Sequence, residues 1–520
     1  ELEDVAEIVR RLDGLPLAIE LAAARLHTHD LGEVAAGLDQ RFALLSSGYR
    51  TSSRHASLGA AVTWSFRLLD ERQQRNFADL SVFVGSFDAH DVAAVCEIDV
   101  VEATNAVAQL VERSLVLRAP AGRYVLLETL RAFGADQLAE AGRDGAVARR
   151  HALHQVHRVE DASRSMHEQG RLVLVEIDAA LPELRGAFGW LLAEGEIDLA
   201  GRLVAGLIHY GFLRLRPDVL TWSERVIRAD PHGASPSASR VWVAAAYASW
   251  MAGDMAEAVV RSDRALHLAE QRADVCPPEV SVFKGNTELF EGRLHEAASW
   301  YRRSAADARD AGHRGHCLMA EATELLALGY AADASVSNRA DELLGVAGVS
   351  ATPYVAYLWY CAGEADLAVD LERAGERHAT AVRLAELTYT SSVIGLSGAS
   401  KASIDARLGD PMVAAEDYCH LIEHWRRAGM WPTQWTMLRS IVGLLCRLGR
   451  DRDAAVLEGA VRSTSGGHSI FGADEVALAA VGAELRERMG TAAYESARLE
   501  GGVLDGNHAV EHALQALRSP

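Results

Sequence analysis

The sequence predicts a mainly α-helical protein in which a helical subdomain and a winged helix are followed by an α-solenoid of helix pairs. Three observations predict this fold class. Apolar residues recur at helical spacing along most of the chain. Two short runs of strand-forming residues flank the turn Pro120-Ala121-Gly122. Beyond residue 236, glycines at expected helix ends recur at intervals of 34 to 46 residues, which brackets a tetratricopeptide unit.

Composition and charge restrict the classes of function. With 520 residues, the chain is long enough for several domains. It has 52 Lys and Arg against 72 Asp and Glu, and its net charge of −20 repels polyanions, so we expect no direct nucleic-acid contact. The six cysteines form no C-x-x-C pair and are interpreted as buried thiols of a cytoplasmic protein. No apolar run reaches the roughly 20 residues of a membrane helix, so no membrane contact is expected.

Residues 1–50 are expected to form a helical subdomain around a tight turn. Asp13-Gly14 breaks one amphipathic helix, and Pro16 occupies the first turn of the next helix, where a backbone N–H is not needed. The chain begins at Glu1 inside an expected helix and without a signal sequence, so we expect an upstream portion. A polar stretch at 46–55 separates this subdomain from the next unit.

Residues 51–147 are expected to form a winged helix, because several helices precede one β-hairpin and another helix closes the unit. The expected helices cover 57–69, 70–83, a segment from 88 onward, 104–112 and 128–141, and the hairpin strands cover 115–118 and 123–127.

The remaining chain is predicted to be helical throughout, with a junction at 148–235, tetratricopeptide-like repeats at 236–455 and a helical cap at 456–520. Each helix pair leaves an apolar face that the next pair buries, and the concave side of such a solenoid usually takes peptides or proteins. The turn glycines expected in the repeats are Gly253, Gly292, Gly329, Gly363, Gly409 and Gly449.

Two groups of residues resemble a known family. The turn Gly14-Leu15-Pro16-Leu17 is similar to the hallmark of the helical subdomain of NB-ARC/STAND nucleotide switches. The blocks "SLGAAVTWSFRLLDERQQRNFADLSVFVGSFDAHDVAAVC", "LVERSLV" and "RYVLLETLRAFGADQLAEAG" resemble the winged helix of actinobacterial STAND regulators of the LuxR and cyclase-linked types.

The resemblance implies that Gly14, Leu15, Pro16 and Leu17 close over the adenine of a bound nucleotide. Much of the family carries Met-His-Asp after the second wing strand, where this chain has Leu126-Leu127-Glu128, so Glu128 is the candidate for a switch latch. The resemblance also implies ADP or ATP with Mg²⁺ in the full-length protein, an upstream nucleotide-binding module, a protein or small-molecule inducer on the repeats, and an oligomer in the active state.

The chain is not expected to be an enzyme by itself, and no catalytic residue is assigned. A phosphate-binding loop needs Gly-Lys-Ser/Thr, but Lys284 is followed by Gly285 and Lys401 by Ala402. No metal site is assigned either. The histidines His151, His154 and His157, and the group His313, His316 and Cys317, are interpreted as packed or solvated side chains, because they lack converging carboxylates.

Two questions about function stay open from the sequence. The expected recognition helix at 104–112 offers Asn105, Gln109 and Glu112 with Arg113 at its end, which favours an intramolecular switch over DNA binding. The predicted function is therefore the sensor and switch portion of a STAND regulator. The alternatives are a protein-interaction scaffold without a nucleotide switch and the regulatory part of a cyclase-linked ATPase.

Trp425, Trp431 and Trp435 are interpreted as core anchors, of which an exposed one would be a partner hot spot.

Overall fold

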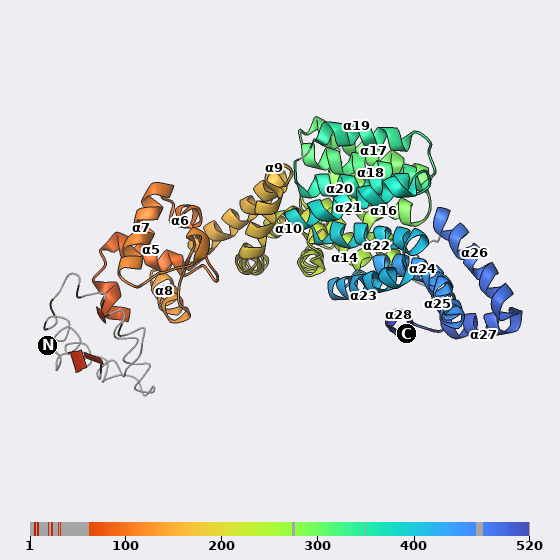
Figure 1. Cartoon of the computed structure of the whole chain (residues 1–520). Helices are drawn as coiled ribbons and strands as arrows, with labels where there is room; N and C mark the ends of the chain where they lie inside the picture. The colour runs from red at the N-terminus through yellow and green to blue at the C-terminus, as the bar shows by residue number, and fades with distance from the viewer. Residues whose placement is uncertain are drawn as a thin grey trace. The chain divides into compact units, whose positions relative to one another are not determined.

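The computed structural model describes residues 62–272, 276–348, 350–463 and 472–518, together with a few isolated positions before residue 62. Two compact units make up the chain. The first unit comprises Glu1–Arg158 and Asp178–Gly195, and the second comprises Val159–Ile177 and Glu196–Pro520. Gly14, Leu15, Pro16 and Leu17, on which the nucleotide prediction depends, lie outside the described residues. Figure 1 gives the labels of the elements.

The first unit is a winged helix, as the sequence predicts. Its elements are α5 (Glu71–Leu80), α6 (Ala89–Cys96), α7 (Val100–Glu112), β1 (Leu117–Arg118), β2 (Tyr124–Val125), α8 (Glu128–Glu140) and both ends of α9 (Asp144–Ala193). The two strands are antiparallel, and Phe87 forms an isolated bridge to Tyr124, which supplies the short third strand of a wing.

Aspartates define where the helices of the first unit begin. Asp70, Asp88 and Asp99 each accept hydrogen bonds from backbone N–H groups of the first turn of α5, α6 and α7, respectively. A side-chain oxygen at this position satisfies a donor that has no partner within the helix, so each Asp fixes a helix start. At the hairpin, Ala121 and Gly122 both have positive φ, which closes the turn that the sequence predicts there.

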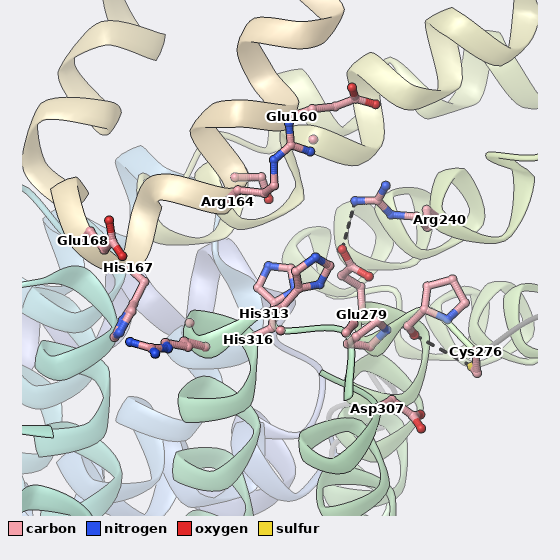
Figure 2. A pocket seen from close by; sticks show the side chains of 18 residues that line it. Glu160, Arg164, His167, Glu168, Arg240, Cys276, Glu279, Asp307, His313 and His316 are labelled. Atoms are coloured by element: carbon pink, nitrogen blue, oxygen red, sulfur yellow. Dashed lines mark hydrogen bonds and ion pairs between the residues drawn. The ribbon is translucent and has the colours of Figure 1, made fainter. Parts of the chain in front are cut away.

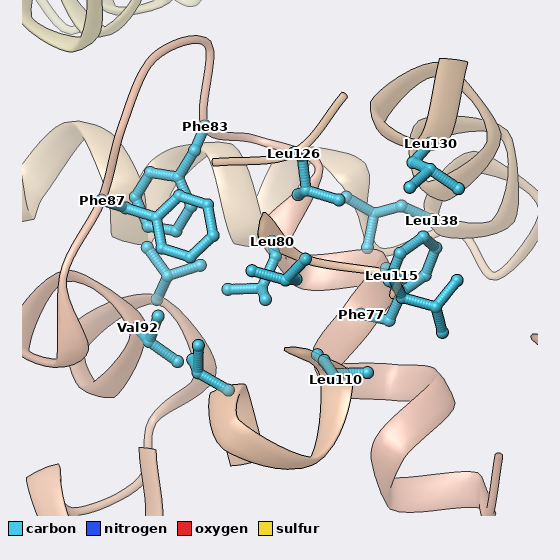
Figure 3. Packing of buried hydrophobic residues seen from close by; sticks show 14 of the residues in the cluster. Phe77, Leu80, Phe83, Phe87, Val92, Leu110, Leu115, Leu126, Leu130 and Leu138 are labelled. Atoms are coloured by element: carbon cyan, nitrogen blue, oxygen red, sulfur yellow. The ribbon is translucent and has the colours of Figure 1, made fainter. Parts of the chain in front are cut away.

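Apolar side chains from α5, α6, α7, the wing and α8 form one core (Figure 3). Phe83 stacks on Phe87 with ring centroids 4.6 Å apart, next to the strand bridge. Phe77, Leu110 and Leu130 are almost fully buried and come from three different helices. The predicted amphipathic helices therefore bury their apolar faces against each other and against the wing.

The helix α9 folds back on itself. A straight helix would place two residues 32 positions apart at about 48 Å. Instead, Nε2 of His151 lies 2.9 Å from Oε2 of Glu183. The two ends of α9 therefore form antiparallel arms in the first unit, while Val159–Ile177 belongs to the second.

The second unit is an array of helices. They are α10 (Ile197–Gly206), α11 (Ile208–Leu213), α12 (Pro217–Leu220), α13 (Ser223–Ala229), α14 (Ala238–Ala252), α15 (Met255–Gln271), α16 (Pro278–Phe290), α17 (Leu294–Asp310), α18 (Arg314–Tyr330), α19 (Val336–Ala347), α20 (Pro353–Asp366), α21 (Leu371–Thr388), α22 (Ser391–Leu408), α23 (Pro411–Ala428), α24 (Trp431–Arg447), α25 (Asp451–Ser463), α26 (Gly472–Met489), α27 (Thr491–Gly501) and α28 (Gly506–Arg518).

Sequential helices of this array pack pairwise, most extensively α14 on α15, α17 on α18 and α20 on α21 (Figure 1). This is the packing expected of a solenoid, in which each pair covers the apolar face of its neighbour. Near the end of the described chain, α28 returns to contact α23, α24 and α25. The predicted α-helical fold class with a solenoid-like array is confirmed.

Four of the six predicted turn glycines lie at helix ends, and two do not. Gly253, Gly292 and Gly449 have positive φ, and Gly409 ends α22. The prediction was wrong for Gly329 and Gly363, which lie inside α18 and α20. A Cβ at Gly329 would come within 2.8 Å of the backbone of Ala365, so these glycines serve close packing of helices.

Two further sequence features can be compared with the structure. All six cysteines are free thiols, three of them buried and three half-buried. Among the described helices, none combines the length and the apolar character that crossing a membrane requires.

Candidate functional site

Asp91, in the first turn of α6, is the centre of a buried charge cluster in the first unit. Its Oδ1 lies 2.8 Å from both Nε2 of His154 and Nη1 of Arg158, on α9. From the wing, Nη2 of Arg123 lies 3.5 Å from Oδ2. Burial raises the pKa of Asp91, but the hydrogen bond from His154 and the charge of Arg158 outweigh burial, so this pKa is below its ordinary value.

A second buried carboxylate lies on α5. Both oxygens of Asp79 accept a hydrogen bond from Nη2 of Arg143 at 2.7 Å. Nη2 of Arg150 lies 3.7 Å from Asp79, while Nε of Arg150 donates to the carbonyl of Val95 at 2.6 Å. Burial raises the pKa of Asp79 despite these arginines. Arg150 therefore joins α9 to both α5 and α6.

A third buried carboxylate, Glu183, connects the two arms of α9 with the loop before α6. One oxygen contacts Nε2 of His151, and the other accepts a hydrogen bond from the backbone N–H of Gly85. Both side chains are almost fully buried. A buried pair of this kind is costly to break from one side, because the remaining partner keeps no compensating contact.

The outward surface of α7 takes no part in these buried ion pairs and instead adjoins a polar hollow. A hollow of about 450 Å³ between α5 and α7 is lined by polar and acidic side chains, namely Asp70, Gln73, Asn76, Asp99, Glu102, Asn105 and Gln109, and by Arg72. Arg72 forms an ion pair with Glu102, and Gln73 donates a hydrogen bond to Gln109 at 2.9 Å. The tip of the wing, Pro120–Gly122, has no charged side chain. Arg123 beside it points back to Ser86 and Asp88.

The latch candidate Glu128 lies at the first position of α8 and is exposed. Its carboxylate forms an ion pair with Arg131 at 2.6 Å. The hydrogen bond from Arg131 and its charge lower the pKa of Glu128. The position places a carboxylate at the positive end of a helix, which is a favourable electrostatic arrangement.

The histidines singled out in the sequence lie in two separate environments. His151 and His154 contact different carboxylates, Glu183 and Asp91. His313 and His316 lie close together, with ring centroids 5.5 Å apart. Within the described parts of the chain, no three His, Cys, Asp or Glu side chains converge as metal ligands would. Sequence reasoning missed the partners of His151 and His154, because these lie 32 and 63 positions away along the chain.

Two of the tryptophans predicted as core anchors are buried. Trp425 is fully buried, and a Cβ at Gly395 would come within 2.3 Å of its ring. Trp435 is buried as well, whereas Trp431 is half-buried and packs against Gly253 and Gly506. The interpretation of these residues as packing anchors is confirmed for Trp425 and Trp435.

The geometry defines a winged helix attached to a helical hairpin by buried ion pairs, and comparison with known proteins agrees. Residues 69–139 match the family model of a winged helix-turn-helix domain. A putative HTH-type transcriptional regulator of Mycobacterium tuberculosis H37Rv is 35% identical over 232 residues, which are 43% of this chain and 26% of that protein. An uncharacterized protein of the same strain is 38% identical over 159 residues, 29% of this chain and 40% of that protein.

The chain therefore matches about a quarter of the length of the first of these relatives. Among solved structures, a STAND protein with a tetratricopeptide repeat sensor from Pyrococcus horikoshii aligns over 94% of this chain and 75% of its own length, with 13% identity and a TM-score of 0.46. This chain is thus similar to putative transcriptional regulators over 43% of its length, and residues 69–139 match a winged helix-turn-helix domain.

Proposed function

We propose that this chain is the switch and sensor portion of a bacterial signal-transduction regulator of the STAND type and is not catalytic by itself. In this proposal the winged helix works through contacts inside the protein, and the helical array receives the signal. An inducer acts by preferring one of two arrangements, since a ligand that binds both equally shifts nothing.

The observation that carries the proposal is the distribution of charge in the winged helix. Arg123, Arg143, Arg150 and Arg158 face the buried carboxylates Asp79 and Asp91. The outward surface of α7 instead carries the exposed Gln109 and Glu112 and the half-buried Glu102. A DNA-binding winged helix needs cations on the helix that enters the major groove, because phosphate contacts supply most of the affinity. An internal role for this winged helix fits the charges better.

The relatives support a regulatory role for the whole protein, since one is named a putative HTH-type transcriptional regulator. For the nucleotide, we propose that ADP or ATP with Mg²⁺ is held by a module that precedes Glu1 in the gene product. Gly14, Leu15, Pro16 and Leu17 would then close over the base, as the family resemblance implies. An assembled, oligomeric active state completes the proposal.

The internal role is tested by measuring DNA binding of the purified chain by fluorescence anisotropy with a random-sequence duplex at about 50 mM salt, where phosphate contacts are strongest. We expect no binding by the unmodified chain. The variant Glu102→Arg/Gln109→Arg/Glu112→Arg serves as the matched control and should gain binding that weakens with salt. Binding of the unmodified chain with a Kd below ~10 μM and a similar salt dependence would contradict the proposal.

The non-catalytic role is tested by phosphate release from ATP with Mg²⁺. We expect no turnover above that of a buffer blank. Turnover that is abolished when Mg²⁺ is chelated would overturn this part of the proposal.

The role of the Gly14–Leu17 turn is tested in a protein that contains the proposed nucleotide-binding module. There, Pro16→Ala should weaken ADP binding by about tenfold, the loss of roughly one good contact. An ADP affinity that Pro16→Ala leaves unchanged would favour a scaffold without a nucleotide switch.

A further inference from the structure

A cavity of about 560 Å³ lies inside the second unit, among α9, α10, α14, α16, α17 and α18. Its size is within the range of pockets that hold small molecules. Figure 2 shows Arg164, the pair Arg240 and Glu279, and the rings of His313 and His316 around one opening. The residues that line the cavity come from five separate stretches of the chain, so the folded array is required to build it.

The buried carboxylates of this cavity already have cationic partners. Glu160 accepts two hydrogen bonds from Arg202, at 2.8 and 2.9 Å. Glu279 accepts one from Arg240 at 2.9 Å. Burial would raise the pKa of Glu279, but neighbouring groups, with Arg240 foremost, lower it to about 2, so the carboxylate stays charged. These carboxylates are therefore poor sites for a cationic ligand.

The other two acidic residues of the cavity lining, Glu168 and Asp307, do not make it a site for a cationic ligand either. Glu168 is exposed to solvent, which screens its charge. Burial raises the pKa of Asp307, which favours its uncharged form, and Arg303 lies nearby with Nε 3.9 Å from the carboxylate. In Figure 2 the side chain of Asp307 lies below Glu279, at the edge of the group.

Several nitrogen atoms at the cavity have no hydrogen-bond partner. Nε of Arg240, Nδ1 of His316 and Nδ1 of His167 are buried and make no hydrogen bond. Buried polar atoms nearly always have a partner in the protein or in ordered water, so these three nitrogens are free to bind a ligand that enters the cavity. Arg240 uses a different nitrogen, Nη2, for Glu279, which leaves its Nε–H available to a second acceptor.

The start of α18 adds positive potential to the same cavity. This 17-residue helix begins at Arg314, has no side-chain hydrogen bond at its cap and has no acidic residue in its first turn. His313, Arg314 and His316 around this start all line the cavity. The unpaired N–H groups of a helix start favour an anion. Arg240 and Arg164, the latter also paired with Asp161, add two guanidinium groups to the same lining.

We infer that this cavity binds a small organic anion, through a carboxylate or phosphate group held by Arg240, His316 and the start of α18. The inference rests on the proposed sensor role and gives that role a ligand class. A bound anion would complete the donors of Arg240 and His316 and would connect α14 with α18. An inducer of this class would thus stabilise one arrangement of the array.

The test uses the purified chain, thermal unfolding and calorimetric titration. The probes are inorganic phosphate and succinate, which distinguish a phosphate from a carboxylate, with glucose as the neutral control and putrescine as the cationic control. We expect at least one anion to raise the Tm and bind with a measurable Kd, and neither control compound to do so.

Variants locate the binding. Arg240→Gln/Glu279→Gln replaces both partners, so no lone buried charge remains, and should raise the Kd for the anion at least about tenfold. Arg314→Ala and His316→Ala should each raise it by a smaller factor. Arg452→Ala, which removes an equal charge from an exposed ion pair on α25, should leave the Kd unchanged.

Three results would overturn the inference: no shift with either anion, anion binding that all these variants leave unchanged, or binding of putrescine or glucose in place of the anions. Each of these would leave the internal role of the winged helix standing, because DNA binding and ATP turnover test that role separately. DNA binding by the unmodified chain would, conversely, overturn the proposed function whatever the anion titration gives.

Discussion

His151 and Glu183 lie 32 positions apart on α9, yet Nε2 of His151 is 2.9 Å from Oε2 of Glu183 in the interior of the first unit. The second oxygen of Glu183 accepts the backbone N–H of Gly85, in the loop that leads to the wing. One carboxylate therefore holds the two arms of α9 together and fixes the loop. Four predictions follow from this and related contacts.

Replacing Glu183 should destabilise the first unit. Glu183→Ala removes the carboxylate partner of the buried His151 and the acceptor of the Gly85 N–H, and we expect a loss of about 2–4 kcal/mol in the free energy of unfolding. Glu183→Gln keeps an acceptor for Gly85 and should cost less. Urea unfolding followed by circular dichroism measures both, with the exposed Glu194→Gln as control. Equal stability of Glu183→Ala and Glu194→Gln would contradict the assignment.

Replacing Asp91 should change both stability and its pH dependence. The pKa of Asp91 is lower in the folded protein than its ordinary value of about 4. The charge of Asp91 therefore stabilises the folded protein above about pH 4, and this stabilisation is lost as the pH falls through the folded pKa. Asp91→Asn should cost about 3 kcal/mol at pH 7, because Arg158, His154 and Arg123 lose their shared partner.

The cost of Asp91→Asn should shrink as the pH falls below about 4, because Asp91 itself then takes up a proton. Urea unfolding at pH 7, 5 and 3.5 measures the trend. Asp99→Asn is the matched control, since Asn and Asp cap a helix start about equally well. A constant difference between Asp91→Asn and the unmodified chain at all three pH values would show that the Asp91 charge contributes nothing.

The two glycines Gly363 and Gly345 should respond oppositely to alanine. A Cβ at Gly363 would lie 2.7 Å from Cε1 of the buried His378 ring, so Gly363→Ala should destabilise the array by about 2 kcal/mol. A Cβ at Gly345 in α19 meets nothing within 4 Å, so Gly345→Ala should stabilise by about 0.5–1 kcal/mol. Urea unfolding followed by tryptophan fluorescence measures both, and equal effects of the two changes would refute the packing role of Gly363.

Glu128→Ala should leave the fold unchanged, because its ion pair with Arg131 is exposed and such pairs contribute little. We expect a Tm within about 1 °C of the unmodified chain. In a protein that contains the proposed nucleotide-binding module, a latch role predicts that Glu128→Ala changes the release rate of a fluorescent ADP analogue. A release rate identical to that of the unmodified protein would remove Glu128 from the switch.

Local signals were sufficient to predict the winged helix. Asp70 and Asp88 begin helices at the predicted positions, and the Pro120-Ala121-Gly122 turn forms the predicted hairpin. The helix expected over 104–112 begins earlier, at Val100 after the capping Asp99. These features depend on a few neighbouring residues, so the sequence displays them directly. The turn glycines were partly misassigned because a glycine inside a helix can also allow a second helix to pack closely, as Gly329 and Gly363 do. After α18, Ala332 takes the positive φ that Gly329 was expected to take.

The buried charge clusters and the cavity could not be predicted, because their members meet only after α9 folds back and the array closes. His154 is separated from Asp91 by 63 positions, and Arg240 is separated from Glu279 by 39. The sequence did mark His313 and His316 as a group, but their neighbours Arg240 and Glu279 belong to other helices. Pairings across such separations leave no periodic trace in a single sequence.

Asp91 accepts a hydrogen bond from the backbone N–H of Asp88 at the start of α6, faces the wing through Arg123 and contacts α9 through His154 and Arg158. His154 and Arg158 share Oδ1, whereas Arg123 and the N–H of Asp88 share Oδ2. A displacement of α9 that removed His154 and Arg158 would therefore leave Arg123, beside the wing, as the one cation of this set next to the Asp91 charge.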